Sequence, residues 1–259
     1  MTLYLWDKYY NLYIAEEDDF LFVRFTIEGK NQYLVPKGTG DIKLAIEKIA
    51  GEEKESVIFR FVTESEKELL ERICGDKVTF YEKPDLHDYV YETEKLINLS
   101  GKKLHSKKNH VNYFEKTFDY TYKRLETEEE LSECRELLLK WVDDKTKNLN
   151  PIEHDAMEKM FDNFKLFDLT GAFIRVDGKI VAMTFGERLT DDTVLIQAEK
   201  ASDDVRGAYP MINKLFLENE WKDTTFVNRE EDMGIEGLRQ AKESYGPIFK
   251  TIKYQAILN

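Results

Sequence analysis

The sequence is poor in cysteine, histidine and proline, and these shortages exclude several classes of protein. Among 259 residues there are 2 cysteines, 4 histidines and 5 prolines. Cys74 and Cys134 stand far apart without metal-ligand spacing, so we expect free thiols rather than a disulfide framework. His154 stands alone, and no group of His, Cys or Asp predicts a metal site. Neither cysteine has a histidine at a spacing that favours covalent catalysis.

Long hydrophobic runs are also missing. No stretch approaches the roughly 20 apolar residues that a membrane-spanning helix needs. Asp7 and Lys8 interrupt the apolar start, so no signal peptide is predicted. With 42% hydrophobic and 13% aromatic residues, the chain has enough apolar material for a packed core. We therefore expect a soluble globular protein of the cytoplasm without a membrane span. The oligomeric state is not readable from these patterns.

Positive charge is scarce everywhere except in one segment. The formal net charge is -13, which makes general nucleic-acid binding a poor expectation. The segment from Lys95 to Phe114 nevertheless holds five lysines, two histidines and no acid. Helical spacing places Lys103, Lys107 and His110 on one stripe. This stripe is either a binding face for a phosphate-bearing donor or the solvated face of a connecting helix.

The first third of the chain predicts the order β-β-α-β-α-β. The expected elements are strands at 20–27 and 31–37, a helix at 40–50, a strand at 56–62, a helix at 63–73 and a strand at 77–82. Glu28-Gly29-Lys30 is typical of a hairpin turn between the first two strands. Thr63 and Glu66 have the spacing of a capping box at the start of the second helix.

The second half predicts the longer order β-α-α-β-β-β-α-β-α-β. The expected elements are a strand at 118–125, helices at 127–148 and 151–167, three strands within 171–201, a helix at 206–221, a strand at 224–228, a helix at 234–246 and a closing strand at 249–258. The last six of these elements repeat the order of the first third. This predicts a structural repeat whose N-terminal copy is truncated.

The expected fold class is α+β, with two such units in tandem. Each unit would hold a twisted, mostly antiparallel mixed sheet flanked by helices. Pro84 interrupts the chain between the two halves, and helical periodicity then carries the basic run. We therefore predict a truncated domain at 1–90, a connecting basic helical segment at 91–117 and a full domain with the donor site at 118–259.

The turn Arg206-Gly207-Ala208 joins a predicted strand to the start of a helix. Gly207 lacks a Cβ, so the backbone can turn tightly and approach a ligand closely. The first amides of the helix favour an anion, and Arg206 adds a charge suited to phosphate. The turn therefore suits a pyrophosphate group, although glycine at a helix terminus is also an ordinary left-handed turn.

The element order and this turn resemble the GCN5-related N-acetyltransferase fold. In that family an Arg/Gln-x-x-Gly-x-Gly/Ala turn holds the pyrophosphate of coenzyme A, and this chain has the shortened form Arg206-Gly207-Ala208-Tyr209. Three longer motifs resemble proteins related to the C-terminal domain of phosphatidylglycerol lysyltransferase. They are LINLSGKKLHSKKNHVNYF, EKASDDVRGAYPMINKLF and NREEDMGIEGLRQAKESYGP. The segment 237–246 is also similar to the GL-x-x-FK-x-x-FG stretch of the Fem peptidyltransferases, which use tandem acetyltransferase-like domains and an aminoacyl-tRNA donor.

These resemblances imply N- or O-acyl transfer between a small-molecule donor and acceptor, with coenzyme A or acyl-CoA as the expected cofactor. The implied cofactor-binding residues are Ile196, Gln197, Ala198, Glu199, Arg206, Gly207, Ala208 and Tyr209. The implied catalytic residues are Glu187, Asn228, Glu230 and Asp232, with Glu199 as a further candidate base and Tyr245 as the candidate acid. The implied substrate- or donor-binding residues are Lys103, Lys107, His110, Trp141 and Lys242.

Two alternatives stay open. The Fem-like segment and the basic run favour an aminoacyl-tRNA-dependent transferase, with tRNA as the partner. A ligand-binding module without turnover would keep the same fold. The loop at 228–232 is as typical of a solvated loop as of a substrate contact, and Tyr245 is as typical of core as of catalysis.

Overall fold

The computed structural model describes residues 2–53, 55–143 and 151–259, apart from the side chains of 140–143, 151 and 152. It forms two compact units. Unit 1 combines Met1–Leu5 with Asp88–Lys250, and unit 2 combines Trp6–His87 with Thr251–Asn259. Each unit has a mixed sheet and its own helices, so the predicted α+β class is confirmed.

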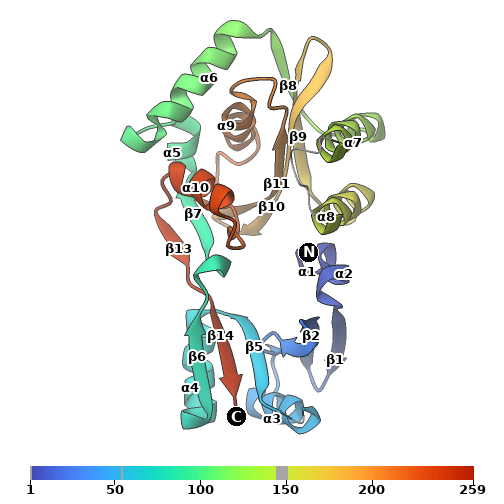
Figure 1. The fold of residues 1–259 in the computed structure, drawn as a ribbon, viewed down its shortest axis with the longest axis vertical. Helices are drawn as coiled ribbons and strands as arrows, with labels where there is room; N and C mark the ends of the chain where they lie inside the picture. Colours follow the sequence, from blue (N-terminus) through green and yellow to red (C-terminus); the bar gives the residue numbers. More distant parts are fainter. Residues whose placement is uncertain (1, 54, 144–150) are drawn as a thin grey trace. The chain divides into compact units, whose positions relative to one another are not determined.

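Unit 1 is the larger of the two. Its elements are α1 Thr2–Leu5, β7 Asp88–Glu92, α5 Thr93–Asn98, η3 Lys102–Leu104, α6 His105–Thr117, β8 Tyr120–Arg124, α7 Glu128–Asp143, α8 Pro151–Asp162, β9 Thr170–Val176, β10 Lys179–Thr190, β11 Thr193–Ala201, α9 Ala208–Glu220, β12 Phe226–Asn228, α10 Glu236–Ser244 and β13 Phe249–Thr251. The strands form one sheet in the order β13-β7-β12-β11-β10-β9-β8 (Figure 1). Strands β11 and β12 are parallel, whereas β8 to β11 pair antiparallel.

Helices cover both faces of the unit 1 sheet. Helix α9 lies on one face together with α5 and α6, and α7 and α8 lie on the other (Figure 1). The α9 face holds a buried apolar cluster that includes Leu104, Val111 and Phe114. These three residues share one helical face, and Phe114 is fully buried. The segment 91–117, which the sequence presents as a connector, therefore belongs to the core of unit 1.

Unit 2 contains the N-terminal elements and the last strand of the chain. Its elements are α2 Asp7–Tyr10, β1 Tyr13–Glu17, β2 Phe20–Ile27, β3 Lys30–Tyr33, β4 Lys37–Gly38, α3 Ile42–Glu52, β5 Val57–Val62, α4 Glu64–Cys74, η1 Gly75–Lys77, β6 Val78–Glu82, η2 Pro84–Leu86 and β14 Tyr254–Leu258. The sheet order is β1-β2-β3-β5-β14-β6, with β4 paired to β2. The predicted capping box of Thr63 and Glu66 is confirmed at the start of α4.

Two segments differ from their predicted roles. The expected single closing strand at 249–258 is two strands, because β13 joins the unit 1 sheet and β14 lies between β5 and β6 of unit 2. Residues 88–92, expected within the helical connection, form β7 between β12 and β13. The two units consequently differ from the predicted ranges 1–90, 91–117 and 118–259, because chain neighbours here pair with different sheets.

The two sheets share a strand order. The series β2-β3-β5-β14-β6 in unit 2 matches β10-β11-β12-β7-β13 in unit 1. In both series the second and third strands are parallel, and the next strand is inserted antiparallel to the third. Helices α3 and α9 precede the third strand, and α4 and α10 precede the last. The inserted strand β14 is the next strand in the chain after β13, the last strand of the unit 1 series, and the inserted strand β7 is the next strand after β6, the last strand of the unit 2 series. This shared order favours the predicted repeat.

Candidate functional site

The candidate site begins where strands β11 and β12 part. The two strands pair only as far as Leu195 and Asn228, whereas β11 continues to Ala201. On its other side β11 has a bulge, because Phe185 pairs with Ala198 and Gly186 with Ile196, which leaves Gln197 without an opposite residue. A bulge re-aims side chains and interrupts the ladder. The predicted donor-binding stretch Ile196–Glu199 lies at this opening.

Next to the bulge, side-chain hydrogen bonds connect two of the candidate bases. The Gln197 amide donates to Glu187 Oε1 at 2.8 Å and to Thr2 Oγ1 at 3.3 Å. The Thr2 hydroxyl in turn donates to Glu230 Oε1 at 3.4 Å. Glu187 and Glu230, which are distant in sequence, therefore approach the same point of β11. Thr2 has no signal in the sequence that marks it as part of this group.

The loop after β12 is held by its own polar groups. Asn228 Oδ1 accepts from the Glu230 amide at 2.7 Å, and its Nδ2 donates to Asp88 Oδ2 at 3.3 Å. Glu230 has a left-handed backbone with φ 55°. The short bond from its amide to Asn228 accompanies this sparsely populated conformation. Asn228 thus positions the Glu230 backbone.

Asp232 is an anchor of this loop. Its carboxylate accepts bonds from the Tyr89 hydroxyl at 2.6 Å, Arg239 Nε at 3.0 Å and the Gly234 amide at 2.9 Å. Burial alone would raise the pKa of Asp232, but the bonds from Arg239 and Tyr89 outweigh burial and hold that pKa well below its ordinary value. A carboxylate held ionised by this many donors is a weak base, so its placement suits structure better than proton transfer.

Arg229 is the charge at the centre of the site. Its side chain is largely buried, and Nη2 donates to Glu199 Oε1 at 3.2 Å. Asn213 of α9 donates to the other oxygen of Glu199 at 2.9 Å. Two buried atoms remain without a partner among the described residues, Nη1 of Arg229 and Oδ1 of Asn213. Unpaired buried polar atoms are costly, and in a native site they often mark where a ligand or water binds.

Tyr245 follows the last turn of α10 and is 6% exposed. The Arg229 guanidinium lies 4.6 Å from its ring centre, and Lys107 Nζ lies 4.4 Å from it. Burial raises the pKa of Tyr245 to about 12, although the Arg229 charge acts to lower it. Burial and the Arg229 charge likewise lower the pKa of Lys107. The phenol is therefore protonated at neutral pH and lies between two cations.

The basic helix α6 brings the predicted stripe to this site. The Lys103 side chain lies over Gly246, where an added Cβ would be 3.1 Å from Lys103 Cδ. Lys107 lies on Tyr245, and the pKa of His110 is lowered by burial and by Arg206 and Lys107. The stripe thus contacts the residues of the site, although whether it binds a donor stays a prediction.

Gly207 lies at a close contact between α9 and α6, and its predicted role in binding a cofactor stays a prediction. Its φ is +92°, in the left-handed region, and a Cβ there would lie 2.5 Å from the His110 carbonyl oxygen. Gly207 therefore allows the start of α9 to pack closely on α6. The neighbouring Arg206 is exposed and lies 4.7 Å from the Tyr113 ring centre.

The start of α9 offers few amides to an anion. The Ala208 amide already donates to the Val205 carbonyl at 3.1 Å. Pro210 has no amide hydrogen. Among the first residues of α9, this leaves the amide of Tyr209. The Tyr209 side chain is partly buried, and burial raises the pKa of its phenol. The start of α9 would therefore offer a pyrophosphate fewer hydrogen-bond donors than the Arg206-Gly207-Ala208 pattern indicates.

Lys242 lies inside the fold rather than on the surface of α10. Its ammonium donates to the Arg229 carbonyl at 2.6 Å and to the Glu231 carbonyl. Burial, followed by the Arg229 charge, lowers the pKa of Lys242 to about 8. The Tyr91 hydroxyl donates to the Lys242 carbonyl at 2.9 Å. Lys242 and Tyr91 therefore hold α10 and the loop after β12 together.

Other candidates are placed less fully. The side chain of Trp141 lies outside the described residues. Tyr89, Tyr91 and Asn213 are site residues that the sequence reasoning missed. The short aromatic and β-branched run Tyr89-Val90-Tyr91 would have indicated a buried strand and so found the two tyrosines.

Within the described parts of the chain, no group of His, Cys, Asp and Glu side chains could hold a metal ion. In the same residues, no helix is long and apolar enough to cross a membrane.

The sheet order and the opening beside the β11 bulge place the protein among acyl- and aminoacyl-transferase-like folds. FemX superposes with a TM-score of 0.64 at 10% identity, over 96% of this chain and 89% of that one. L-PGS from Bacillus licheniformis gives 0.65 at 18% identity, over 95% and 82%.

The chain belongs to the family described as phosphatidylglycerol lysyltransferase, C-terminal, whose model matches residues 1–257. A conserved protein of unknown function from Bacteroides thetaiotaomicron is 36% identical, with a TM-score of 0.90 over 99% of this chain and 89% of that one. An uncharacterized protein from Mycoplasmoides gallisepticum is 25% identical over 176 residues, which is 64% of this chain but only 54% of that relative. The predicted resemblance is thereby confirmed.

Proposed function

We propose that unit 1 transfers an acyl group from an oxygen ester, of the kind found in aminoacyl-tRNA, to an amine or hydroxyl acceptor. Family membership and the FemX-like fold support group transfer of this class. The observation that carries the choice of an ester is the start of α9, where the Ala208 amide is engaged and Pro210 has no amide hydrogen, so that the pyrophosphate of coenzyme A would find few donors.

Tyr245 can supply a proton to an oxygen leaving group. Burial raises the pKa of its phenol, so the phenol is protonated at neutral pH and can donate its proton as the ester C–O bond breaks. Arg229 and Lys107 would stabilise the phenolate that forms.

The remaining steps use the group beside the bulge. The acceptor N–H or O–H gives its proton to Glu187 or Glu230 as its lone pair forms the new bond to the acyl carbon. The ester C–O bond then breaks, and the leaving oxygen takes the Tyr245 proton. The carboxyl proton returns to the phenolate through solvent. The opened edge of β11 at Ile196–Glu199 supplies amides for the acyl oxygen.

Coenzyme A is the second candidate donor, favoured by the exposed Arg206 at the Gly207 turn. Its pyrophosphate would have the Arg206 charge but few amides, because Ala208 is engaged and Pro210 has none. The non-catalytic module remains the outcome in which either donor binds without turnover.

The test compares Tyr245→Phe with Tyr120→Phe, another partly buried tyrosine of unit 1. tRNA charged with labelled lysine is offered with phosphatidylglycerol in detergent or with an amine-bearing peptide as acceptor. We expect transfer by the parent protein, a loss of roughly 100-fold or more for Tyr245→Phe and little change for Tyr120→Phe. Equal rates for the two variants would contradict the proposal. Turnover of acetyl-CoA with an affinity that depends on Arg206 would instead establish the second candidate.

A further inference from the structure

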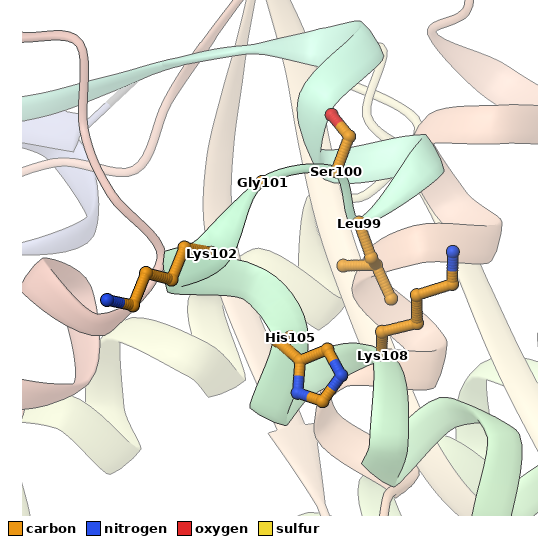
Figure 2. Close-up of a pocket in the computed structure, with 6 residues that line it drawn as sticks. All are labelled: Leu99, Ser100, Gly101, Lys102, His105 and Lys108. Atoms are coloured by element: carbon orange, nitrogen blue, oxygen red, sulfur yellow. The ribbon is translucent and has the colours of Figure 1, made fainter.

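A cavity of about 490 Å³ lies on the outer side of the basic segment. Leu99, Ser100, Gly101, Lys102, His105 and Lys108 line it (Figure 2). Only Leu99 is buried, and the polar residues are exposed. These residues differ from the stripe of Lys103, Lys107 and His110 that contacts the site, so the cavity is a separate feature of η3 and α6.

Of the five lysines of the basic segment, one has a carboxylate partner among the described residues. Lys95 pairs with Glu92 at 2.9 Å. Within the described parts of the chain, no ion pair is made by Lys102, Lys103, Lys107 or Lys108. In a protein with a net charge of -13, four lysines this close together without a counter-ion form a local excess of positive charge. Such a local field attracts an anionic partner despite the overall charge.

The directions of the side chains indicate an extended anion. Lys108 runs from α6 back toward Leu99, with His105 beside it, whereas Lys102 extends away on the other side of the loop (Figure 2). Two ammonium groups that diverge in this way do not converge on one phosphate ion. They would contact different phosphates of an extended polyanion, which favours a nucleic-acid strand over a small anion.

We infer that the pocket lined by Lys102, His105 and Lys108 binds the phosphodiester backbone of an RNA strand. The inference rests on the proposed function for the identity of the strand, which is the tRNA that carries the ester. Lys107 then acts near the ester, and the pocket holds phosphates farther along the same chain. A lipid surface fits less well, because the only apolar residue of the pocket, Leu99, is 3% exposed.

Filter binding of uncharged tRNA over a range of salt tests the pocket without requiring turnover. The double variant Lys102→Gln/Lys108→Gln is compared with Lys179→Gln/Lys222→Gln, which removes the same charge from exposed lysines of the same unit. We expect the first variant to bind roughly tenfold or more weakly at low salt and to lose about 1.5 from the salt slope. The second variant should change little.

Three outcomes would overturn the inference. Equal weakening by both double variants would show that only net charge matters. Unchanged tRNA affinity with reduced binding to phosphatidylglycerol vesicles would assign the pocket to a membrane surface. Tight binding of inorganic pyrophosphate that depends on Lys102 and Lys108 would assign it to a small anion. Normal lysyl transfer at saturating tRNA by the pocket variant would leave the proposed function intact, and tRNA binding without transfer would leave the pocket intact.

Discussion

The two units share a strand order but differ in how many polar side chains they bury. Among the described residues of unit 2, the buried polar side chains are Gln32 and His87. Those of unit 1 are Thr93, Glu130, Thr184, Asn213, Thr224, Asn228, Asp232 and Lys242. Burying polar groups costs free energy unless they are paired, so a fold retains so many only where they position something. The comparison therefore favours unit 1 as the location of the proposed chemistry.

The difference arises at one equivalent place in the chain. In unit 2 strand β5 ends at Val62, and Thr63 at once caps helix α4. In unit 1 strand β12 ends at Asn228, but α10 begins only at Glu236. The intervening loop carries Arg229, Glu230 and Asp232. A longer loop after the central strand of an otherwise similar sheet thus supplies three charged groups of the candidate site.

The largest expected effect is the unfolding of unit 2 while unit 1 stays folded. Ala256 of β14 is fully buried and pairs with Phe59 and Phe80. Ala256→Asp buries an unpaired charge in a central strand, which should cost roughly 4 kcal/mol or more. Hydrogen exchange should show lost protection in β5 and β6, with β10 and β11 unchanged. Asn259→Asp, at an exposed position, is the control, and equal loss in β10 and β11 would show that the units do not unfold separately.

A smaller effect is the dependence of the stability of unit 1 on pH. The pKa of Lys242 is about 8 in the folded protein, against 10.5 as its ordinary value. Between these values the unfolded chain binds more protons, so stability is greatest at high pH and is lost as pH falls from 10.5 toward 8. Unit 1 should gain roughly 2 kcal/mol between pH 8 and 9.5, because one pKa unit is worth about 1.4 kcal/mol.

Lys242→Met should flatten this pH slope, as measured by denaturant unfolding or by exchange of unit 1 amides. Lys222→Met, at an exposed position of the same unit, should keep the slope of the parent protein. A slope that persists in Lys242→Met would assign the titration to another group, of which Lys107 is the first candidate because its pKa is also lowered.

An effect on a similar scale distinguishes three glycines with left-handed backbones. Gly207, Gly178 and Gly29 all have positive φ, but only at Gly207 would a Cβ meet other atoms. Substitution by alanine should cost about 1 kcal/mol at Gly178 and Gly29 from backbone strain alone. Gly207→Ala should cost roughly 1 to 3 kcal/mol more, because α6 must move away from α9. Thermal unfolding of the three variants measures the difference, and equal costs would mean that the α6 contact is loose.

Local signals in the sequence predicted much of the fold. The capping box of Thr63 and Glu66 is present, with the Thr63 amide donating to Glu66 Oε2 at 2.8 Å. The hairpin turn expected at Glu28-Gly29-Lys30 connects β2 and β3. The register of such elements depends on residues close in sequence, so a single chain can reveal it.

Long-range pairing was beyond the same reasoning. The segment 249–258 reads as one strand because nothing in its residues marks the change of sheet between Thr251 and Tyr254. The site was found only in part for the same reason. The stretch Ile196–Glu199 was a candidate from the resemblance to the fold family, whereas Asn213, Tyr89 and Thr2 join the site through contacts with residues far away in the chain.

By itself, the sequence determined the α+β class, most of the helices and strands, the family, and a basic segment without acids. Those properties follow from composition, from hydrophobic periodicity and from helix capping, and the last two act over a few neighbouring residues. Only the tertiary structure decided that the basic helix packs into unit 1 through Phe114, with Lys107 lying on Tyr245. It also decided that β7 joins the unit 1 sheet although β6 before it belongs to unit 2, and that β14 joins the unit 2 sheet although β13 before it belongs to unit 1. These outcomes depend on which distant surfaces bury each other, because burial of apolar area is non-directional and leaves no local mark in the chain.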